Sequence, residues 1–175
     1  DSGGNFIWAK QFGGINNDRG SAVALDSNNN VYIIGDFSGT ADFDPGAGTY
    51  NLISGPYGDI FISKLDSTGS FVWAKSFGGS DSPGGGYDYS YSIAIDSYGN
   101  VVSTGWFFGT ADFDPSAYNV YLTSTGSYDI FIAKLDASGN FLWAKAMGGI
   151  GLDFSYSVDI DGAGIIDVGE RLRRG

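Results

Sequence analysis

One short segment occurs three times in this chain, and the repetition limits the possible folds more than any other feature. Residues 5–10 read Asn-Phe-Ile-Trp-Ala-Lys, and near copies occupy residues 70–75 and 140–145. A pair of glycines follows each copy, at positions 13–14, 78–79 and 148–149. Internal repetition at a fixed period indicates supersecondary units that bury their apolar faces against their neighbours. The chain is therefore expected to be an array of similar units.

Two further segments recur in each period and help to divide it into strands. Residues 39–45 and 109–115 both read Gly-Thr-Ala-Asp-Phe-Asp-Pro, and residues 59–62 and 129–132 both read Asp-Ile-Phe-Ile. In the second period we predict four strands, over 90–96, 100–107, 129–136 and 140–147. Turns rich in Asp, Asn and Gly separate the first pair and the last pair, as hairpins require. The insertion at 109–128 is long enough to hold an extra hairpin.

The composition and the alternation of side chains favour stacked sheets. Glycine accounts for 29 residues, aromatic residues for 16% and charged residues for only 17%, which suits short strands joined by tight turns. In residues 71–77 one face carries Phe, Trp, Lys and Phe, while the other carries Val, Ala and Ser. Neither face is strongly polar, so each sheet is expected to be covered on both sides. We predict an all-β fold, a β-propeller-type array of four-stranded antiparallel blades that is incomplete within one chain.

The predicted organisation is a single repeat domain over residues 1–175. It comprises a lone strand at 5–13, blade one at 18–79, blade two at 88–149, a partial blade at 153–170 and a basic tail at 171–175. Propellers typically have about four to eight blades, so this array is too short to close into a ring alone. Three explanations stay open: a fragment of a longer array, a protomer that completes its sheets with neighbouring chains, or a processing or cloning scar at 171–175.

These repeated segments resemble the bacterial beta-propeller repeat family known as SBBP repeats. The resemblance rests on residues 96–101 with Gly105, on the segment 109–115, and on residues 129–136 leading to the Trp-Ala-Lys of 143–145. It extends over nearly the whole chain, from about residue 5 to residue 169. It implies an exported or surface protein with propeller-like blades, and it implies no well-defined activity.

The turn before the repeated tryptophan also resembles the tryptophan-docking repeat of quinoprotein dehydrogenases and the Asp-box of sialidases. The loop from Asp66 to Trp73 is one residue shorter than the first motif and longer than the second. The resemblance implies that the aspartate closes the turn and that the tryptophan packs between blades. The residues expected to have these structural roles, with the repeated phenylalanines, are Trp8, Trp73, Trp143, Phe61, Phe131, Asp66 and Asp136.

The charge and the missing residue types exclude several function classes. The net charge of -11 argues against nucleic acid, because phosphates are neutralised by Lys and Arg. The chain has no Cys and no His, which removes disulfides, thiolate nucleophiles, Cys/His zinc sites and imidazole acid–base chemistry. No apolar run approaches the ~20 residues that a membrane-spanning helix needs. We therefore expect neither nucleic-acid binding nor membrane insertion.

Calcium is the cofactor that an acidic surface of this kind permits. In a meander of four strands, the loops after the second and the fourth strand share one rim, and repeated aspartates lie in both loops. Carboxylate oxygens are the ligands that Ca²⁺ takes, six to eight of them. The alternative is that each aspartate caps its own loop through local backbone hydrogen bonds. The segment 159–162 raises the same two possibilities. The candidate calcium ligands are Asp18, Asp42, Asp44, Asp88, Asp112, Asp114 and Asp153.

The expected function is structural or adhesive, at a cell surface or outside the cell. An open stack of blades exposes apolar faces and unpaired strand edges, which are association sites. Different surfaces at the two ends make a heterologous contact, which gives a ring or a filament. We therefore expect a homo-oligomer or polymer that associates end to end.

Carbohydrate binding is the alternative function, and catalysis is less favoured. Tyrosines at 87, 89, 91 and 98 lie near the rims of one blade, where exposed rings would suit sugar stacking or simply cover strand ends. A glycosidase needs paired carboxylates with aromatic platforms, which Asp42, Asp44, Trp106 and Tyr57 could supply. However, the Asp-Phe-Asp segment occurs in both full blades, as a structural unit does. We therefore expect a protein that is not an enzyme.

Overall fold

Each full period folds into four antiparallel strands in chain order, in a computed structural model that describes residues 3–79 and 87–172. The four strands of each blade pair in chain order, as in a meander, and an inserted hairpin separates the second strand from the third in sequence. The described residues contain no helix, and hence none that could cross a membrane. The predicted fold class is confirmed. Blade one contains β2 (Asp18–Leu25), β3 (Val31–Phe37), β6 (Asp59–Leu65) and β7 (Phe71–Gly79). Blade two contains β8 (Tyr89–Ile95), β9 (Val101–Phe107), β12 (Asp129–Leu135) and β13 (Phe141–Met147).

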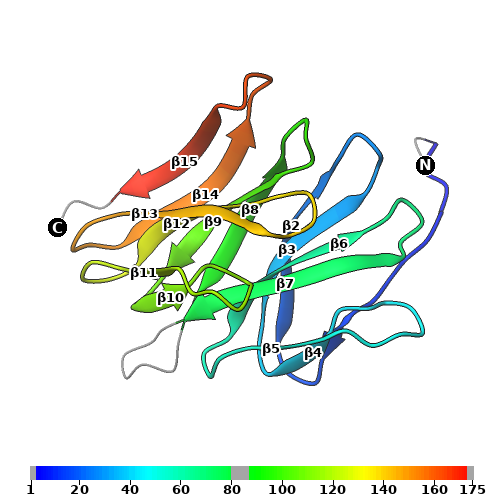
Figure 1. Ribbon diagram of the computed structural model, residues 1–175, viewed down its shortest axis with the longest axis horizontal. Helices are drawn as coiled ribbons and strands as arrows, with labels where there is room; N and C mark the ends of the chain where they lie inside the picture. The colour runs from blue at the N-terminus through cyan, green and yellow to red at the C-terminus, as the bar shows by residue number, and fades with distance from the viewer. Residues whose placement is uncertain (1–2, 80–86, 173–175) are drawn as a thin grey trace.

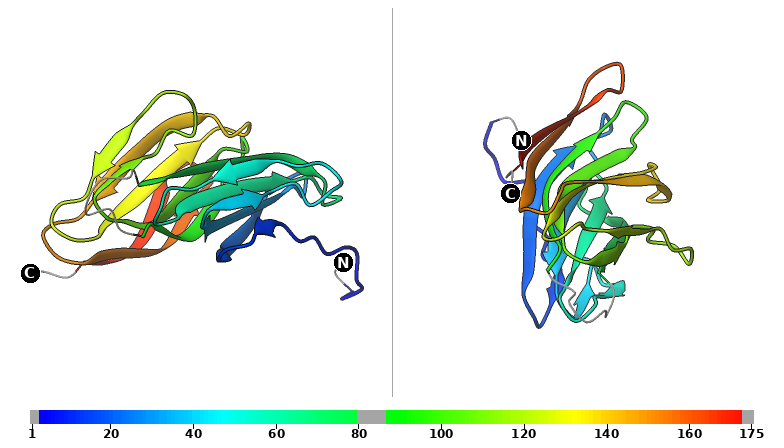
Figure 2. Two further views of the ribbon diagram at one scale, coloured as in Figure 1. Left: turned by 90° about the horizontal axis from the view of Figure 1, so that it is seen from below. Right: turned by 90° about the vertical axis from the view of Figure 1, so that its left-hand side faces the viewer.

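The partial blade has two described strands, β14 (Asp153–Ile160) and β15 (Ile166–Leu172). Figure 1 shows the sheets side by side, from the N-terminal strands in blue to β15 in red, with the two termini at opposite ends. The views in Figure 2 show the same succession of sheets from below and from one end. The blades therefore form an open array within this chain.

The insertion between the second and third strands of each full blade forms a short hairpin. The strands are β4 (Thr40–Asp42) with β5 (Asn51–Ile53), and β10 (Thr110–Asp112) with β11 (Tyr121–Thr123). Each hairpin pairs with the glycine pair of the preceding repeat: β10 with the end of β7, and β4 with β1 (Gly13–Gly14). A Cβ atom on Gly14 would overlap the carbonyl oxygen of Thr40. Gly14 therefore lets the first glycine pair approach the backbone of β4 closely.

The prediction of a lone strand over residues 5–13 is wrong for all but its last residue. Residues 4–12 have no strand, and the first ladder begins at Gly13. In the full blades, the corresponding strand is stabilised by a ladder to the third strand, such as β7 on β6. Among the described residues, the segment 4–12 is paired with no other strand. We refer to residues 3–12 as the N-terminal arm.

The core consists of apolar clusters between successive sheets. The largest joins blade one to blade two and includes Tyr32, Ile62, Trp73, Phe107 and Phe131. A second lies between blade one, its hairpin and the arm, and a third lies between blade two and the partial blade. The central strands β3 and β6 bury side chains on both faces. This agrees with the expectation that each sheet is covered on both sides.

Candidate functional site at the blade seams

The repeated tryptophan connects one blade to the turn of the next. Trp73, on β7 of blade one, is 9% exposed, and its indole Nε1 donates a hydrogen bond to the Ala137 carbonyl oxygen at 3.2 Å. Ala137 lies in the turn between β12 and β13 of blade two. Gly139 closes that turn at φ +80°, and a Cβ there would lie 3.2 Å from the Trp73 ring. The turn glycine therefore provides both the left-handed backbone and the room for the ring.

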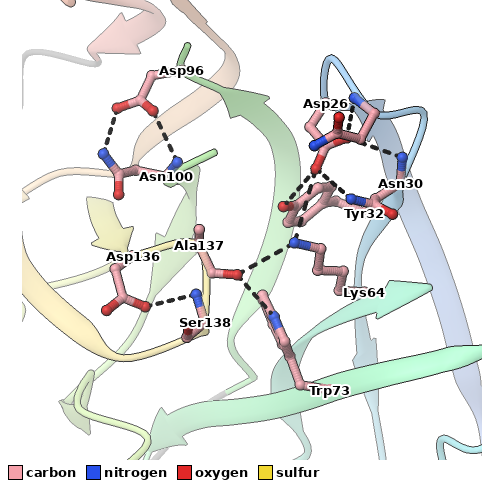
Figure 3. A network of polar contacts seen from close by, with 11 residues as sticks. Asp26, Asn30, Tyr32, Lys64, Trp73, Asp96, Asn100, Asp136, Ala137 and Ser138 are labelled. Carbon is pink, nitrogen blue, oxygen red and sulfur yellow. Dashed lines mark hydrogen bonds and ion pairs between the residues drawn. The ribbon is translucent and has the colours of Figure 1, made fainter. Parts of the chain in front are cut away.

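Polar side chains reinforce the same contact, which Figure 3 shows from close by. Lys64 of blade one lies 3.4 Å from the Ala137 oxygen and 3.9 Å from a carboxylate oxygen of Asp26. Asp136 closes the turn by accepting hydrogen bonds from the backbone N–H groups of Ser138 and Asn140, at 2.8 and 2.9 Å. Asp66 does the same in blade one. These aspartates act within their own turns, while the tryptophan crosses between blades.

The N-terminal arm makes the same contact without forming a strand. The Trp8 indole donates to the Ser67 carbonyl oxygen at 3.2 Å, and a Cβ on Gly69 would lie 3.1 Å from the Trp8 ring. Phe12 lies 5.6 Å from Phe43 and 6.0 Å from Phe61, ring to ring. In the next repeat, the Phe77–Phe113 and Phe77–Phe131 distances are also 5.6 and 6.0 Å. The arm thus occupies, against blade one, the position that β7 occupies against blade two.

The third tryptophan, Trp143 on β13, has no such partner within the described residues. It is half-buried, whereas Trp73 is buried. Its neighbours Leu142 and Met147 are 47% and 37% exposed. None of the described turns accepts a hydrogen bond from its indole. The outer side of β13 therefore presents the surface that a following blade covers in the two earlier repeats.

The candidate calcium aspartates mostly bind the backbone of their own loops. Asp18, Asp88 and Asp153 accept hydrogen bonds at 2.6, 2.6 and 2.7 Å from the second glycine of each repeated pair. The Asp-Phe-Asp carboxylates accept local backbone bonds: Asp42 from Asp44 and Tyr50, Asp44 from Gly46, Asp112 from Asp114 and Val120, and Asp114 from Ser116. The bonds from Tyr50 and Asp44 hold the pKa of the exposed Asp42 carboxyl below its usual value. This is the loop-capping arrangement.

Three of the candidate ligands do come together at one cleft. Asp18, Asp42 and Asp44 line a cleft of about 500 Å³ with Gln11 and Asn16. Within the described ranges, however, no group of three or more acidic side chains is placed to hold a metal ion. The calcium site remains a prediction from the sequence.

Buried carboxyl groups lie at the rim formed by the loops after the second and the fourth strand of each blade. The sequence pattern identified only some of them. Asp88 and Asp129 are each 3% exposed. Burial raises the pKa of Asp88 to about 7, against the lowering effect of backbone hydrogen bonds from Gly79 and Phe108. Burial also raises the pKa of Asp129, which begins β12 and was not among the candidate ligands. Its position in the repeated Asp-Ile-Phe-Ile segment is the signal that could have found it.

The side chains proposed for a glycosidase are not gathered into one site. Asp42 and Asp44 line the cleft beside the arm, whereas Trp106 packs against Tyr89, Tyr128 and Phe154. The four tyrosines considered for glycan binding do not form a single cluster either. Tyr87 and Tyr89 are in ring contact at 6.0 Å, Tyr91 contacts Tyr156, and Tyr98 is 84% exposed on the turn after β8.

The comparison with known families agrees with this architecture. The family model for SBBP, described as a beta-propeller repeat, matches residues 7–40. This segment runs from the arm through β2 and β3 to the start of β4. The resemblance drawn from the repeated segments is confirmed over these residues. Fold and match together define a β-propeller-type repeat protein.

Two curated proteins are similar over most of this chain. An uncharacterized WD repeat-containing protein of Acanthamoeba polyphaga mimivirus is 27% identical over 89% of this chain. The regulatory protein FlaEY of Caulobacter vibrioides is 26% identical over 92% of it. The chain spans only 12% and 16% of the lengths of these two relatives. The likeness therefore concerns a small part of two much longer proteins.

Proposed function

We propose that this chain is a structural interaction module that associates end to end with further copies of itself. The observation that carries the proposal is the unfilled surface at Trp143. In the two earlier repeats the same tryptophan donates to a turn carbonyl of the next blade, at 3.2 Å each time. Since Trp143 lies in the same sequence context, a turn of the same kind is the partner its surface fits.

The partner turn on the second copy is the one from Asp66 to Gly69 in blade one. Among the described residues, that turn is covered by the N-terminal arm, which is held by the Trp8 indole and by Phe12 and has no strand ladder of its own. Residues 140–147 of another copy have nearly the sequence of residues 5–12, and Phe141–Met147 already form a strand, β13. In our proposal β13 of one copy displaces the arm of the next and docks Trp143 on Ser67. The contact is heterologous, so repetition gives a ring or a filament.

Light scattering of the purified chain at micromolar concentration tests this proposal. We expect oligomers for the unmodified chain, monomers for Trp143→Ala, and larger assemblies for Trp8→Ala, because the second substitution frees the blade-one turn. Tyr118→Ala is the control, since Tyr118 is 80% exposed on the loop between β10 and β11 and belongs to neither β13 nor the turn from Asp66 to Gly69. A folded, monomeric unmodified chain would contradict the proposal, as would oligomers that persist in Trp143→Ala.

We further propose that the module acts outside the cell or at its surface, without catalytic activity. The absence of Cys and His from the sequence and the capping role of the Asp-Phe-Asp carboxylates support a non-enzymatic role. Antibody labelling of intact cells of the source organism tests the location. Labelling that requires permeabilised cells would overturn it.

A further inference from the structure

The contacts between successive blades follow one plan, but their rims differ. We call the contact between blade one and blade two seam one, and that between blade two and the partial blade seam two. At the rim of seam two, Trp106 on β9 lies 4.5 Å from Tyr128 and 5.5 Å from Phe154, ring to ring. Phe108 lies 5.3 Å from Tyr128. Aromatic rings therefore fill the rim of seam two.

The equivalent positions of seam one carry small or polar side chains. The strand registers equate Asp36 with Trp106, because Asp36 pairs with Ile60 and Trp106 with Ile130. In the same alignment Ser38 stands where seam two has Phe108. Gly58 stands where seam two has Tyr128, and both of these residues directly precede the aspartate that begins the third strand. Three aromatic rings are thus absent from seam one.

A cleft occupies the space that those rings fill in seam two. Its volume is about 210 Å³, and its lining includes Asn17, Asp36, Ser38, Tyr57, Tyr87 and Tyr89. Drug-sized ligands occupy pockets of roughly 300 Å³ or more. The seam-one cleft is smaller than that, which suits a single ring-sized group.

Two exposed tyrosine rings stand at the edge of this cleft. Tyr57 and Tyr87 are 43% and 57% exposed, with centroids 6.2 Å apart and planes at 80°. Tyr87 is also 6.0 Å from Tyr89. Tyrosine offers an apolar ring face together with a hydroxyl group, so two rings at this angle can contact two sides of one small ligand.

The polar groups of the cleft favour a neutral ligand with hydroxyl groups. Asp36 has a side chain that is 18% exposed and lies 3.9 Å from Arg19; burial raises its pKa, against the opposing effect of Arg19. Carboxylates accept hydrogen bonds from hydroxyl groups, and Asn17 and Ser38 can donate as well as accept. Asp36 and Asp88 in the lining, together with the chain's net charge of -11, disfavour anions.

We propose that the seam-one cleft binds one neutral pyranose residue of a glycan, with its C–H face on the tyrosine rings and its hydroxyl groups on the polar side chains. Positions that build the array recur in each repeat, as the glycines and docking tryptophans do. The cleft arises where one repeat departs from that pattern. The proposal is independent of end-to-end association, because Trp143 and the arm do not line the cleft.

Titration with a panel of neutral methyl glycosides and oligosaccharides, followed by saturation-transfer NMR, tests the proposal. We expect at least one neutral glycan to bind, and Tyr57→Ala and Tyr87→Ala each to weaken it by about tenfold or more. The double variant Asp36→Trp/Ser38→Phe gives seam one two of the three rings that seam two has in addition, and it should abolish binding. Tyr118→Ala is the matched control and should bind normally.

The thermal midpoint of every variant establishes that it is folded. The monomeric variant Trp143→Ala should keep its affinity for glycan, which separates this proposal from the proposed self-association. Three results would overturn it: no binding by any neutral glycan at millimolar concentration, binding only to anionic polysaccharides, or binding unchanged by the ring-filled double variant.

Discussion

Seam one and seam two join sheets with the same strand order but differ in their outer contacts. The Trp73 indole reaches a turn of the next blade in seam one, whereas Trp143 has no such partner among the described residues. In each blade, a glycine in the second strand leaves room for the backbone of the first strand of the same blade: a Cβ on Gly35 would overlap the Arg19 carbonyl oxygen, and one on Gly105 that of Tyr89. At the rim, seam one has a polar cleft beside Asp36, whereas seam two has packed rings around Trp106. The difference shows that the close backbone contacts within each blade are the same in both repeats, while the rim of the seam varies.

The largest effect is expected from the interior, where the repeats do not differ. Phe131 is fully buried against Phe77 and Phe113, so Phe131→Ala should lower the free energy of unfolding by about 3–5 kcal/mol. Phe61→Ala should cost less, because the arm that covers Phe61 can collapse into the space. Urea denaturation measures both. Equal losses would mean that the arm packs as firmly as a strand.

A smaller loss is expected at the rim of seam two. Trp106 is only half-buried, so Trp106→Ala should cost about 2–3 kcal/mol and should open a cleft like that of seam one. Urea denaturation gives the stability, and binding of the neutral glycan panel reports the new cleft. A loss below about 0.5 kcal/mol, the range of ordinary surface substitutions, would show that the rings do not stabilise the seam.

Much of this architecture could be predicted from the sequence, because repetition reports the unit directly. The strands of both full blades follow from turns such as 96–100, where Asp96 accepts from the backbone of Tyr98 and Asn100. The arm could not be read correctly, since residues 5–10 have the sequence of a strand and lack only its ladder partner. The pairing of each inserted hairpin with the preceding repeat was also hidden, because it depends on contacts between units.

The cleft of seam one was not predicted for a different reason. The candidate site residues of the sequence analysis come from segments that recur, such as Asp-Phe-Asp, and the aspartates of these segments cap loops. The informative positions are those where recurrence fails, at 36, 38 and 58. The recurring segments 39–45 and 59–62 already align position 38 with 108 and position 58 with 128, but the sequence does not show that these positions share one rim.

The carboxyl group of Asp88 in seam one should make stability depend on pH. Its pKa is raised to about 7, so the folded state keeps a proton that the unfolded state loses near pH 4. The resulting stabilisation is present below about pH 4 and is lost as the pH rises through 7. In the unmodified chain, the free energy of unfolding should fall by an amount on the order of 2 kcal/mol between pH 4 and 8 because of this group. In Asp88→Asn this fall should be absent, as measured by urea denaturation at each pH. An identical pH profile in the variant would show that Asp88 titrates normally.

The smallest effect is expected from calcium, and it compares the two Asp-Phe-Asp hairpins. The first lines a cleft with Asp18, and in both hairpins the first aspartate already accepts two backbone hydrogen bonds. A ligand stabilises only the state that binds it, in proportion to the logarithm of its concentration over Kd. With its carboxylates engaged in capping, the chain should show a melting temperature within about 1 °C in millimolar Ca²⁺ and in chelator, since tight binding would shift it by several degrees. A larger rise that disappears in Asp44→Asn but persists in Asp114→Asn would instead assign a calcium site to the first hairpin, where the arm brings Asp18 close.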